Sequence, residues 1–357
     1  MNWIKRLLHN DSNIFDLTIP EETESKVVAQ VPAFETSAPD EEIPMVRPSH
    51  PFAPVIIAIG GGKGGVGKSI VSSTLGVLFA GQGEKVLLVD TDLGAANLHT
   101  FLGSANGERS LADFFKDKSP AIEECISKTS IPGLDIVNGA QDAHRDAADL
   151  DGARIGELQR ALRSTDYDYV LLDVGPGTAS NILSIFMMAD EGIVVTTPEP
   201  TSIENSYRFL NCLLLHRLKK NIAVQKNEEF RSLLRRVFEG RNGEGARTIA
   251  ALMARVREID ERQGKALEAA MGKTSLAIVV NQVKRSGDRE IGPLMQRACY
   301  DFFGVKVSHL ATIDYEDCVV DSIRARKPLG IHHRESQTVR ILEGVTKSLI
   351  QKRRERV

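Results

Sequence analysis

Cysteine is scarce in this chain of 357 residues, and no C-x-x-C pair occurs among its four cysteines, which are Cys125, Cys212, Cys299 and Cys318. This spacing argues against a disulfide framework and against a four-cysteine metal site within one chain. No apolar run approaches the roughly 20 residues of a membrane span. The N-terminus also lacks the apolar stretch and small-residue cleavage site of a secretory signal. We therefore expect a cytoplasmic protein.

An excess of charge of one sign is also missing. The chain has 45 Lys and Arg against 48 Asp and Glu, which gives a formal net charge of -3. Overall charge therefore does not indicate nucleic-acid binding, although a local basic patch would still be compatible with it.

Residues 1–53 differ in composition from the rest of the chain. Seven of the fourteen prolines lie at or before Pro54, and none of the 29 glycines does. Between Asp11 and Glu42 many acidic residues accompany a single lysine. Such a segment buries too little apolar surface to offset its ordering entropy, so we expect a disordered tether over about residues 12–52.

The first nine residues, Met1–His9, have a different character. Trp3, Ile4, Leu7 and Leu8 can share one face of a short helix, with basic residues beside it. This pattern predicts docking to a membrane surface or to a protein partner. The alternative is a terminus that packs on the folded domain.

From Pro54 onward the sequence alternates between short apolar runs and helical stretches. The runs are continuous rather than alternating, as in strands that are buried on both faces. They are Val55–Ile59, Lys85–Val89, Leu134–Val137, Tyr167–Leu172, Gly192–Thr196, Leu276–Val280 and Val305–Leu310. Helices are expected at Ser69–Ala80, Arg154–Leu162 and Thr178–Ala189. The alternation predicts an α/β domain over 54–345, with a mostly parallel, doubly wound sheet and flanking helices.

A stretch of about 80 residues between two predicted strands is too long for one crossover helix. From Arg217 to Lys273 it contains fourteen Lys and Arg and eight Asp and Glu. Apolar residues recur there at helical spacing, on both sides of the glycine cluster Gly240–Gly245. We expect a basic helical insertion over about 217–273, which either contacts a partner or DNA or is simply a solvated charged face.

A phosphate-binding loop follows the first strand. Residues 60–69 read GGGKGGVGKS and fit G-x-x-x-x-G-K-[ST] from Gly62 to Ser69. The glycines let successive backbone N–H groups point at phosphate oxygens, and the next helix presents its positive N-terminus. In such a loop Lys68 reaches the terminal phosphates and the Ser69 hydroxyl can ligate Mg²⁺.

Polar residues follow three other predicted strands. Asp90 and Asp92 end the second strand, Asp173 ends the buried run before Gly175-Pro176-Gly177, and Asn281 ends the Leu276–Val280 run. Carboxylates at strand ends beside a phosphate loop lie where Mg²⁺ or an attacking water must be. Aspartate is also common as a helix cap or turn residue, so each carboxylate has a purely structural alternative.

The sequence KGGVGKS resembles the deviant phosphate loop of the MinD/ParA class of ATPases. The run from Asp90 through Asn97 to Gly103 is similar to their first switch segment, and residues 173–177 to their second. The resemblance implies an ATP-dependent homodimer in which Lys63 reaches the partner's nucleotide. It further implies that Asp92 orients the hydrolytic water, that Asp90 supports the metal, and that Asn97 lies near the dimer interface. Asp173 would hold Mg²⁺ through water, and Asn281 would recognise adenine.

The implied site therefore has three overlapping sets of residues. Lys63, Lys68 and Asp92 would be catalytic, and Ser69, Asp90 and Asp173 would hold Mg²⁺. ATP would be bound by Gly62, Lys63, Gly64, Gly65, Val66, Gly67, Lys68, Ser69, Ile70 and Asn281.

The run Thr196–Ile203 resembles the flagellar-placement branch (FlhG, FleN, YlxH) more than plasmid ParA. Two departures matter. The I-P-x-D motif is replaced by Ile313-Asp314-Tyr315-Glu316, and no D-Q-A-x-x-L activation motif occurs at the N-terminus.

The resemblance implies a switch that closes as a dimer with ATP and positions a division site, flagellum, pilus or other polar cargo. Such a protein would act in the cytoplasm and attach peripherally at the inner face of the membrane or at a pole. A DNA-segregation ATPase is the main alternative, with DNA bound by the insertion and by a basic tail over 346–357. An Fe–S carrier of the same class would need cysteine spacing that is absent, so no Fe–S cluster is expected. A tyrosine-kinase relative is disfavoured because residues 316–357 contain no tyrosine.

Overall fold

The computed structural model describes residues 53–92, 96–104, 107–116, 121–139, 152–220, 248–272 and 275–355. The Met1–His9 segment, the tether and the first half of the insertion lie outside these residues. Within them, no helix has both the length and the apolar character that crossing a bilayer would require.

One eight-stranded sheet organises the domain, in the order β3-β4-β2-β5-β1-β6-β7-β8. Every neighbouring pair is parallel except β3 and β4. The strands are β1 (Val55–Gly60), β2 (Val86–Asp90), β3 (Ile126–Lys128), β4 (Leu134–Val137), β5 (Tyr169–Asp173), β6 (Glu191–Thr196), β7 (Ser275–Val283) and β8 (Val307–Asp314). All seven predicted strands are present, and among the described residues the edge strand β3 is the one strand that the prediction missed.

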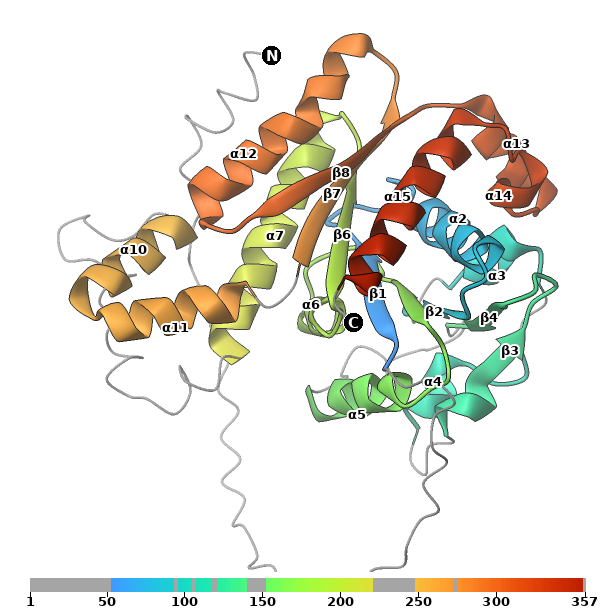
Figure 1. Cartoon of the computed structure of the whole chain (residues 1–357), viewed down its shortest axis with the longest axis horizontal. Coiled ribbons are helices and arrows are strands. Elements are labelled where there is room, and N and C mark those ends of the chain that lie inside the picture. The colour runs from blue at the N-terminus through green and yellow to red at the C-terminus, as the bar shows by residue number, and fades with distance from the viewer. Residues whose placement is uncertain are drawn as a thin grey trace, which may run out of the picture.

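Helices cover both faces of the sheet, as the continuous apolar strands require (Figure 1). In β1, Ile57 and Ile59 face a core shared with α2 (Lys68–Gly81) and α15 (Gln337–Arg354). Ile56 and Ala58 face the opposite core. That core is covered by α5 (Gly152–Arg163), α6 (Ser180–Met187), α7 (Pro200–Lys220) and α12 (Ile291–Phe303). The predicted doubly wound α/β architecture is therefore confirmed.

Shorter helices complete the domain. They are α3 (Leu98–Leu102), α4 (Leu111–Phe114), α13 (Asp317–Ala325) and α14 (Leu329–His332), with 3₁₀ turns at Ile122–Cys125 and Ser286–Glu290. Helices α3, α13 and α14 gather beside α2 at one end of the molecule (Figure 1).

The insertion is helical in its described half, but its bounds differ from the prediction. Helix α7 runs unbroken to Lys220, so the insertion does not begin at 217. Two helices follow later, α10 (Ile249–Ile259) and α11 (Glu261–Met271). They meet at Asp260, whose carboxylate accepts a hydrogen bond from the Gln263 N–H at 3.0 Å and so caps α11. Both helices contribute buried side chains to the main core, so they belong to the folded domain.

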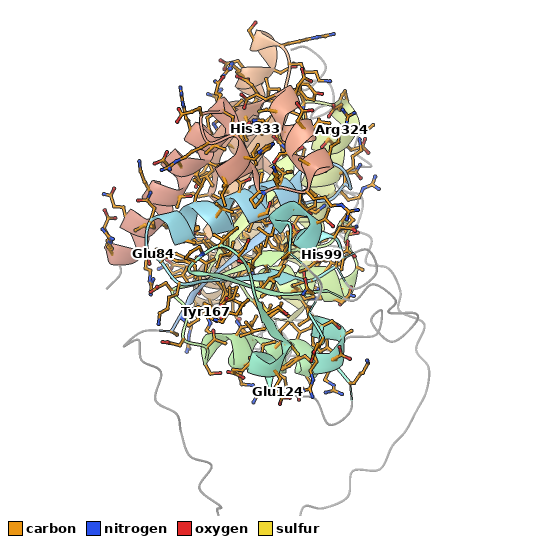
Figure 2. All side chains as sticks on the ribbon, turned by 90° about the vertical axis from the view of Figure 1, so that its right-hand side faces the viewer. Glu84, His99, Glu124, Tyr167, Arg324 and His333 are labelled. Carbon is orange, nitrogen blue, oxygen red and sulfur yellow. The ribbon has the colours of Figure 1, made fainter. Side chains whose placement is uncertain are left out.

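The basic residues predicted as a tail over 346–357 lie in helix α15 as far as Arg354. Helix α15 crosses residue 345 without a break, and Leu349 and Ile350 are buried. Arg353 bridges Asp168 at 2.8 Å and Glu84 at 3.4 Å, on the side of the molecule where Figure 2 labels Glu84. Lys352 pairs with Glu191 at 2.7 Å. Acidic residues far away in the sequence thus tie these basic residues into the fold.

Candidate functional site

The phosphate loop connects β1 to the N-terminus of α2. Gly65 and Gly67 have φ values of 77° and 96°, a left-handed conformation that favours glycine. Gly62 is needed for a different reason, because a Cβ there would lie 2.1 Å from the Asn205 carbonyl oxygen. These constraints explain the spacing of the glycines, and they leave Lys68 as the first residue of the helix.

Lys68 is buried, and its ammonium group donates a hydrogen bond to the Lys63 carbonyl oxygen at 3.3 Å. This contact folds the side chain back over its own loop. Burial lowers the pKa of Lys68, while the nearby charges of Asp173 and Asp92 oppose that effect. The lysine is thus a desolvated cation that faces carboxylates and the mouth of the loop.

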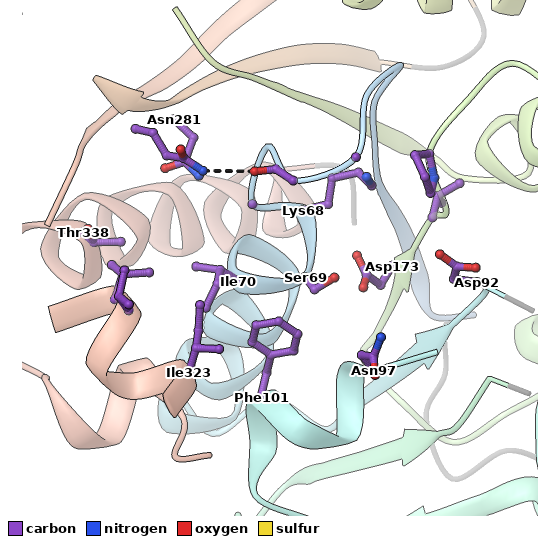
Figure 3. A pocket seen from close by; sticks show the side chains of 18 of the residues that line it. Lys68, Ser69, Ile70, Asp92, Asn97, Phe101, Asp173, Asn281, Ile323 and Thr338 are labelled. Carbon is purple, nitrogen blue, oxygen red and sulfur yellow. Dashed lines mark hydrogen bonds between the residues drawn. The ribbon is translucent and has the colours of Figure 1, made fainter. Parts of the chain in front are cut away.

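A cavity of about 470 Å³ opens in front of this loop (Figure 3). It lies at the carboxyl ends of the parallel strands, where ligands bind in open α/β sheets. The predicted residues that line it are Gly64, Gly65, Gly67, Lys68, Ser69, Ile70, Asp90, Asp92, Asp173 and Asn281. The cavity therefore collects most of the predicted site from four separate parts of the chain.

Three predicted residues lie outside the cavity lining. Gly62 packs against α7, and Val66 is buried with its carbonyl oxygen accepting a hydrogen bond from Asn281 at 2.9 Å. The Lys63 ammonium points elsewhere and donates to the Thr201 hydroxyl at 3.1 Å. Lys63 therefore does not contribute its charge to the cavity of its own chain in this conformation.

Asp90 is buried and caps the segment that leads into α3. Its two carboxylate oxygens accept hydrogen bonds from the N–H groups of Asp92 at 3.0 Å and Leu98 at 3.1 Å. Burial raises the pKa of Asp90 to about 6 in spite of these bonds. The structural alternative considered for this aspartate is therefore realised, and it also fixes the backbone of Asp92.

Asp173 is a second buried carboxylate of the site. Burial raises its pKa to about 7, with repulsion from Asp90 adding to the effect and hydrogen bonding to Ser69 opposing it. Its Oδ1 atom is buried and has no hydrogen-bond partner. A buried carboxylate oxygen that lacks a partner, next to a second carboxylate and a hydroxyl, fits a hard cation with oxygen ligands such as Mg²⁺.

Protein ligands alone do not make a metal cage. In the part of the chain that the structure describes, no group of three or more His, Cys, Asp or Glu side chains could hold a metal ion. This matches Mg²⁺ sites that use one or two protein oxygens together with substrate phosphates and water.

Asp92 lies at the phosphate end of the cavity, near Lys68 and Asp173, and Asn281 lies at the other end (Figure 3). Gly175 lies beside Asp92, and a Cβ on Gly175 would make ordinary van der Waals contact with the Asp92 carboxyl carbon at 3.4 Å. Asp92 is partly exposed, so a carboxylate is available to a ligand or water there.

Sequence reasoning missed several lining residues. Phe101, Val319, Val320 and Ile323 form an apolar wall beside Ile70, and Gln282 lines the cavity next to Asn281. No sequence signal identified Gln282. The segment that replaces the I-P-x-D motif also reaches the cavity, since Asp314, Tyr315 and Glu316 line it. Glu316 is engaged by the N-terminus of α15, because it accepts a hydrogen bond from the Thr338 N–H at 2.7 Å.

Comparison with known proteins agrees with this geometry. A family model described as an AAA domain matches residues 55–226. The septum site-determining protein MinD of Helicobacter pylori is 32% identical over 176 residues, which are 48% of this chain and 65% of that protein. The Escherichia coli protein of the same name is 29% identical over 161 residues, covering 44% of this chain and 58% of that protein. The chain thus spans less than two thirds of these curated relatives.

Solved structures extend the likeness to most of the domain. The MinD of Pyrococcus horikoshii, solved as a complex with Mg-ADP, gives a TM-score of 0.57 at 22% identity and covers 83% of this chain and 96% of its own. A ParA family ATPase from Chlorobium tepidum gives 0.52 at 17% identity, covering 82% and 98%. In sequence and in fold, the chain is similar to the MinD/ParA class of P-loop proteins. At these identities the solved structures support the fold, and the sequence relatives together with the loop support the class.

This similarity confirms the resemblance drawn from KGGVGKS. It does not single out the flagellar-placement branch, since the relatives given above are MinD and ParA proteins.

Proposed function

We propose that this chain binds ATP with Mg²⁺ in the cavity and hydrolyses it. The observation that supports this best is the convergence of the phosphate loop, Asp92, Asp173 and Asn281 on one cavity. The structure of a relative named as a complex with Mg-ADP supports the same ligand.

In this proposal the phosphates lie in the curl of Gly64–Ser69, where backbone N–H groups and the start of α2 stabilise their charge. Lys68 offsets the charge that develops on the terminal phosphate, at no reorganisation cost, because it is already buried at the loop. Ser69 and Asp173 would hold Mg²⁺, which supplies further charge stabilisation when bound. Asp90 supports these ligands by fixing the segment around Asp92.

Asp92 would orient the attacking water. Its carboxylate lies near Lys68, and Asp90 holds its backbone N–H, so the group is positioned before substrate arrives. Asn281 would contact adenine, since its amide oxygen is an acceptor suited to an exocyclic amine. Its N–H is already held by the Val66 carbonyl, which fixes the side-chain orientation.

Lys63 would act in trans, in an ATP-dependent homodimer. Its ammonium is hydrogen-bonded to Thr201, outside the lining of its own cavity. A cation at the end of a flexible side chain can instead reach a neighbouring phosphate, much as an arginine finger does. Asn97, which lines the cavity, would lie near the same interface.

The cellular role that we propose is spatial positioning. The curated relatives are named as septum site-determining proteins, which favours the division site, while a flagellum, pilus or other polar cargo fits the same switch. Met1–His9 would attach the dimer weakly to a membrane surface or a protein partner at the inner face of the membrane.

DNA binding through the insertion and the C-terminus is the alternative. In the described residues much of that basic charge is already paired, for example Arg257 with Glu268 and Lys265 with Glu261. This observation favours positioning over DNA segregation.

The test is ATP hydrolysis by the full chain and by Asp92→Ala. The variant should bind ATP normally but turn over roughly 10²–10⁴-fold more slowly, because only water orientation is lost. Co-sedimentation with liposomes and with DNA, each with ATP and with ADP, separates the two cellular roles. Wild-type turnover in the variant would remove Asp92 from the mechanism.

A further inference from the structure

The end of β7 contains an irregularity that faces the phosphate loop. In the pairing of β7 with β8, Val280 lies opposite Thr312 and Val283 opposite Asp314. Two residues, Asn281 and Gln282, therefore lie opposite the single residue Ile313. This is the count of a β-bulge, a feature that is common beside active sites and re-aims side chains.

Gln282 adopts a conformation that glutamine rarely takes. Its φ is 59°, and among the residues that the structure describes only Gln282 and Arg326 combine a side chain with a positive φ. Such a conformation has a steric cost, and it persists where the surroundings determine it.

The bulge brings two neighbouring amides to the same loop. In a regular strand Asn281 and Gln282 would point to opposite faces of the sheet. Here Asn281 donates to the Val66 carbonyl oxygen at 2.9 Å, and Gln282 donates to the Gly65 carbonyl oxygen at 3.2 Å. Gly67 permits this approach, because a Cβ there would lie 2.2 Å from the Asn281 amide nitrogen.

We propose that Gln282 is a positioning residue for nucleotide binding, which holds the phosphate loop in its phosphate-accepting curl. Two adjacent carbonyls of the loop are occupied by side-chain amides from β7, so they stay turned toward the bulge. The N–H groups that follow these two carbonyls, those of Val66 and Gly67, are then left for an anion. Gln282 acts through the Gly65 backbone and needs no contact with the nucleotide. This inference rests on the proposed nucleotide site and adds a residue to it.

The test compares Gln282→Gly and Gln282→Met with wild type. Gln282→Gly removes the amide donor, and glycine adopts the positive φ without steric cost. The melting temperature without nucleotide should therefore stay close to that of wild type. Gln282→Met keeps an unbranched chain without the donor. Both should bind a fluorescent ADP analogue, with Mg²⁺, about three- to tenfold more weakly, which is the range for one net hydrogen bond. The KM for ATP should change by a larger factor than the turnover rate at saturating ATP, because Gln282 acts on the loop backbone through Gly65.

Arg326→Gly is the matched control. It relieves the same kind of backbone conformation at the C-cap of α13, outside the cavity lining, and should leave ADP affinity unchanged. ADP affinity equal to wild type in Gln282→Met would overturn the inference, as would equal losses of affinity in Arg326→Gly. If wild type itself fails to bind the ADP analogue, the proposed function fails instead, so the two outcomes are distinct. Should Gln282→Gly not fold, Gln282→Met decides.

Discussion

Asp173 should stabilise the bound nucleotide and destabilise the empty protein. Burial and the neighbouring Asp90 raise its pKa from an ordinary value of 3.8 to about 7. At about 1.4 kcal/mol per pKa unit, a rise of this size lowers the free energy of unfolding by roughly 4 kcal/mol at a pH where the carboxyl is ionised in the folded protein. Part of the shift comes from repulsion between Asp173 and Asp90, and this part belongs to the pair rather than to Asp173 alone. We therefore expect Asp173→Asn to raise the free energy of unfolding of the empty protein by roughly 2–4 kcal/mol at pH 8.

The direction of the pH dependence follows from the raised pKa. A carboxyl whose pKa is higher in the folded state holds its proton more tightly there, so folding is favoured below about pH 4. That contribution is lost as the pH rises from about 4 to 7. The stability difference between Asp173→Asn and wild type should therefore be small below about pH 4, should grow between pH 4 and 7, and should reach its full value by about pH 8.

Thermal unfolding in the absence of nucleotide measures this effect. We expect Asp173→Asn to melt roughly 5–10 °C above wild type at pH 8. Addition of Mg²⁺ and ADP should raise the melting temperature of wild type and change that of the variant little, because the metal ligand is missing. An empty variant that melts below wild type at pH 8 would refute the reasoning, since the carboxylate would then be stabilising by itself.

Three further predictions test other parts of the structure. Lys68→Ala should abolish tight binding of ATP, because the buried cation at the loop is lost; affinity within a factor of two of wild type, measured by calorimetry, would reject the loop assignment. Lys63→Ala should bind ATP as wild type does, yet lose turnover; normal turnover would show that Lys63 does not act in trans. Arg353→Met should lower the free energy of unfolding by roughly 3–5 kcal/mol in chemical denaturation, because the carboxylates of Asp168 and Glu84 lose their ion pairs with Arg353, while the control Lys347→Met, which breaks an exposed pair, should change it little. Equal effects of the last two would mean that the end of α15 is not part of the fold.

Local pattern was sufficient for the strands and for the phosphate loop. The central strands β1, β2, β4, β5 and β6 are almost entirely buried, so their apolar runs are nearly unbroken. The glycines and lysines of the loop form a contiguous motif. The edge strand β3 was missed because Ile126–Lys128 has only three residues and none of them is buried. Nothing in so short a segment separates it from a turn.

Contacts between distant parts of the chain explain two other differences between the sequence prediction and the structure. Lys352 and Arg353 look like a basic tail because their acidic partners Glu191, Asp168 and Glu84 are far away in the sequence. Gln282 was missed for a similar reason. A bulge depends on the register between β7 and β8, and the sequence of one strand does not reveal that register.

The mass of the protein in solution tests the central claim, an ATP-driven dimer, most directly. One chain has a mass of 39.1 kDa. In Asp92→Ala, where slow hydrolysis preserves the ATP state, light scattering coupled to size exclusion should give twice that mass with Mg²⁺ and ATP. The same variant with ADP should give the mass of one chain, and so should the double variant with Lys63→Ala in ATP. A protein that binds ATP but keeps the mass of one chain in every case would contradict the account.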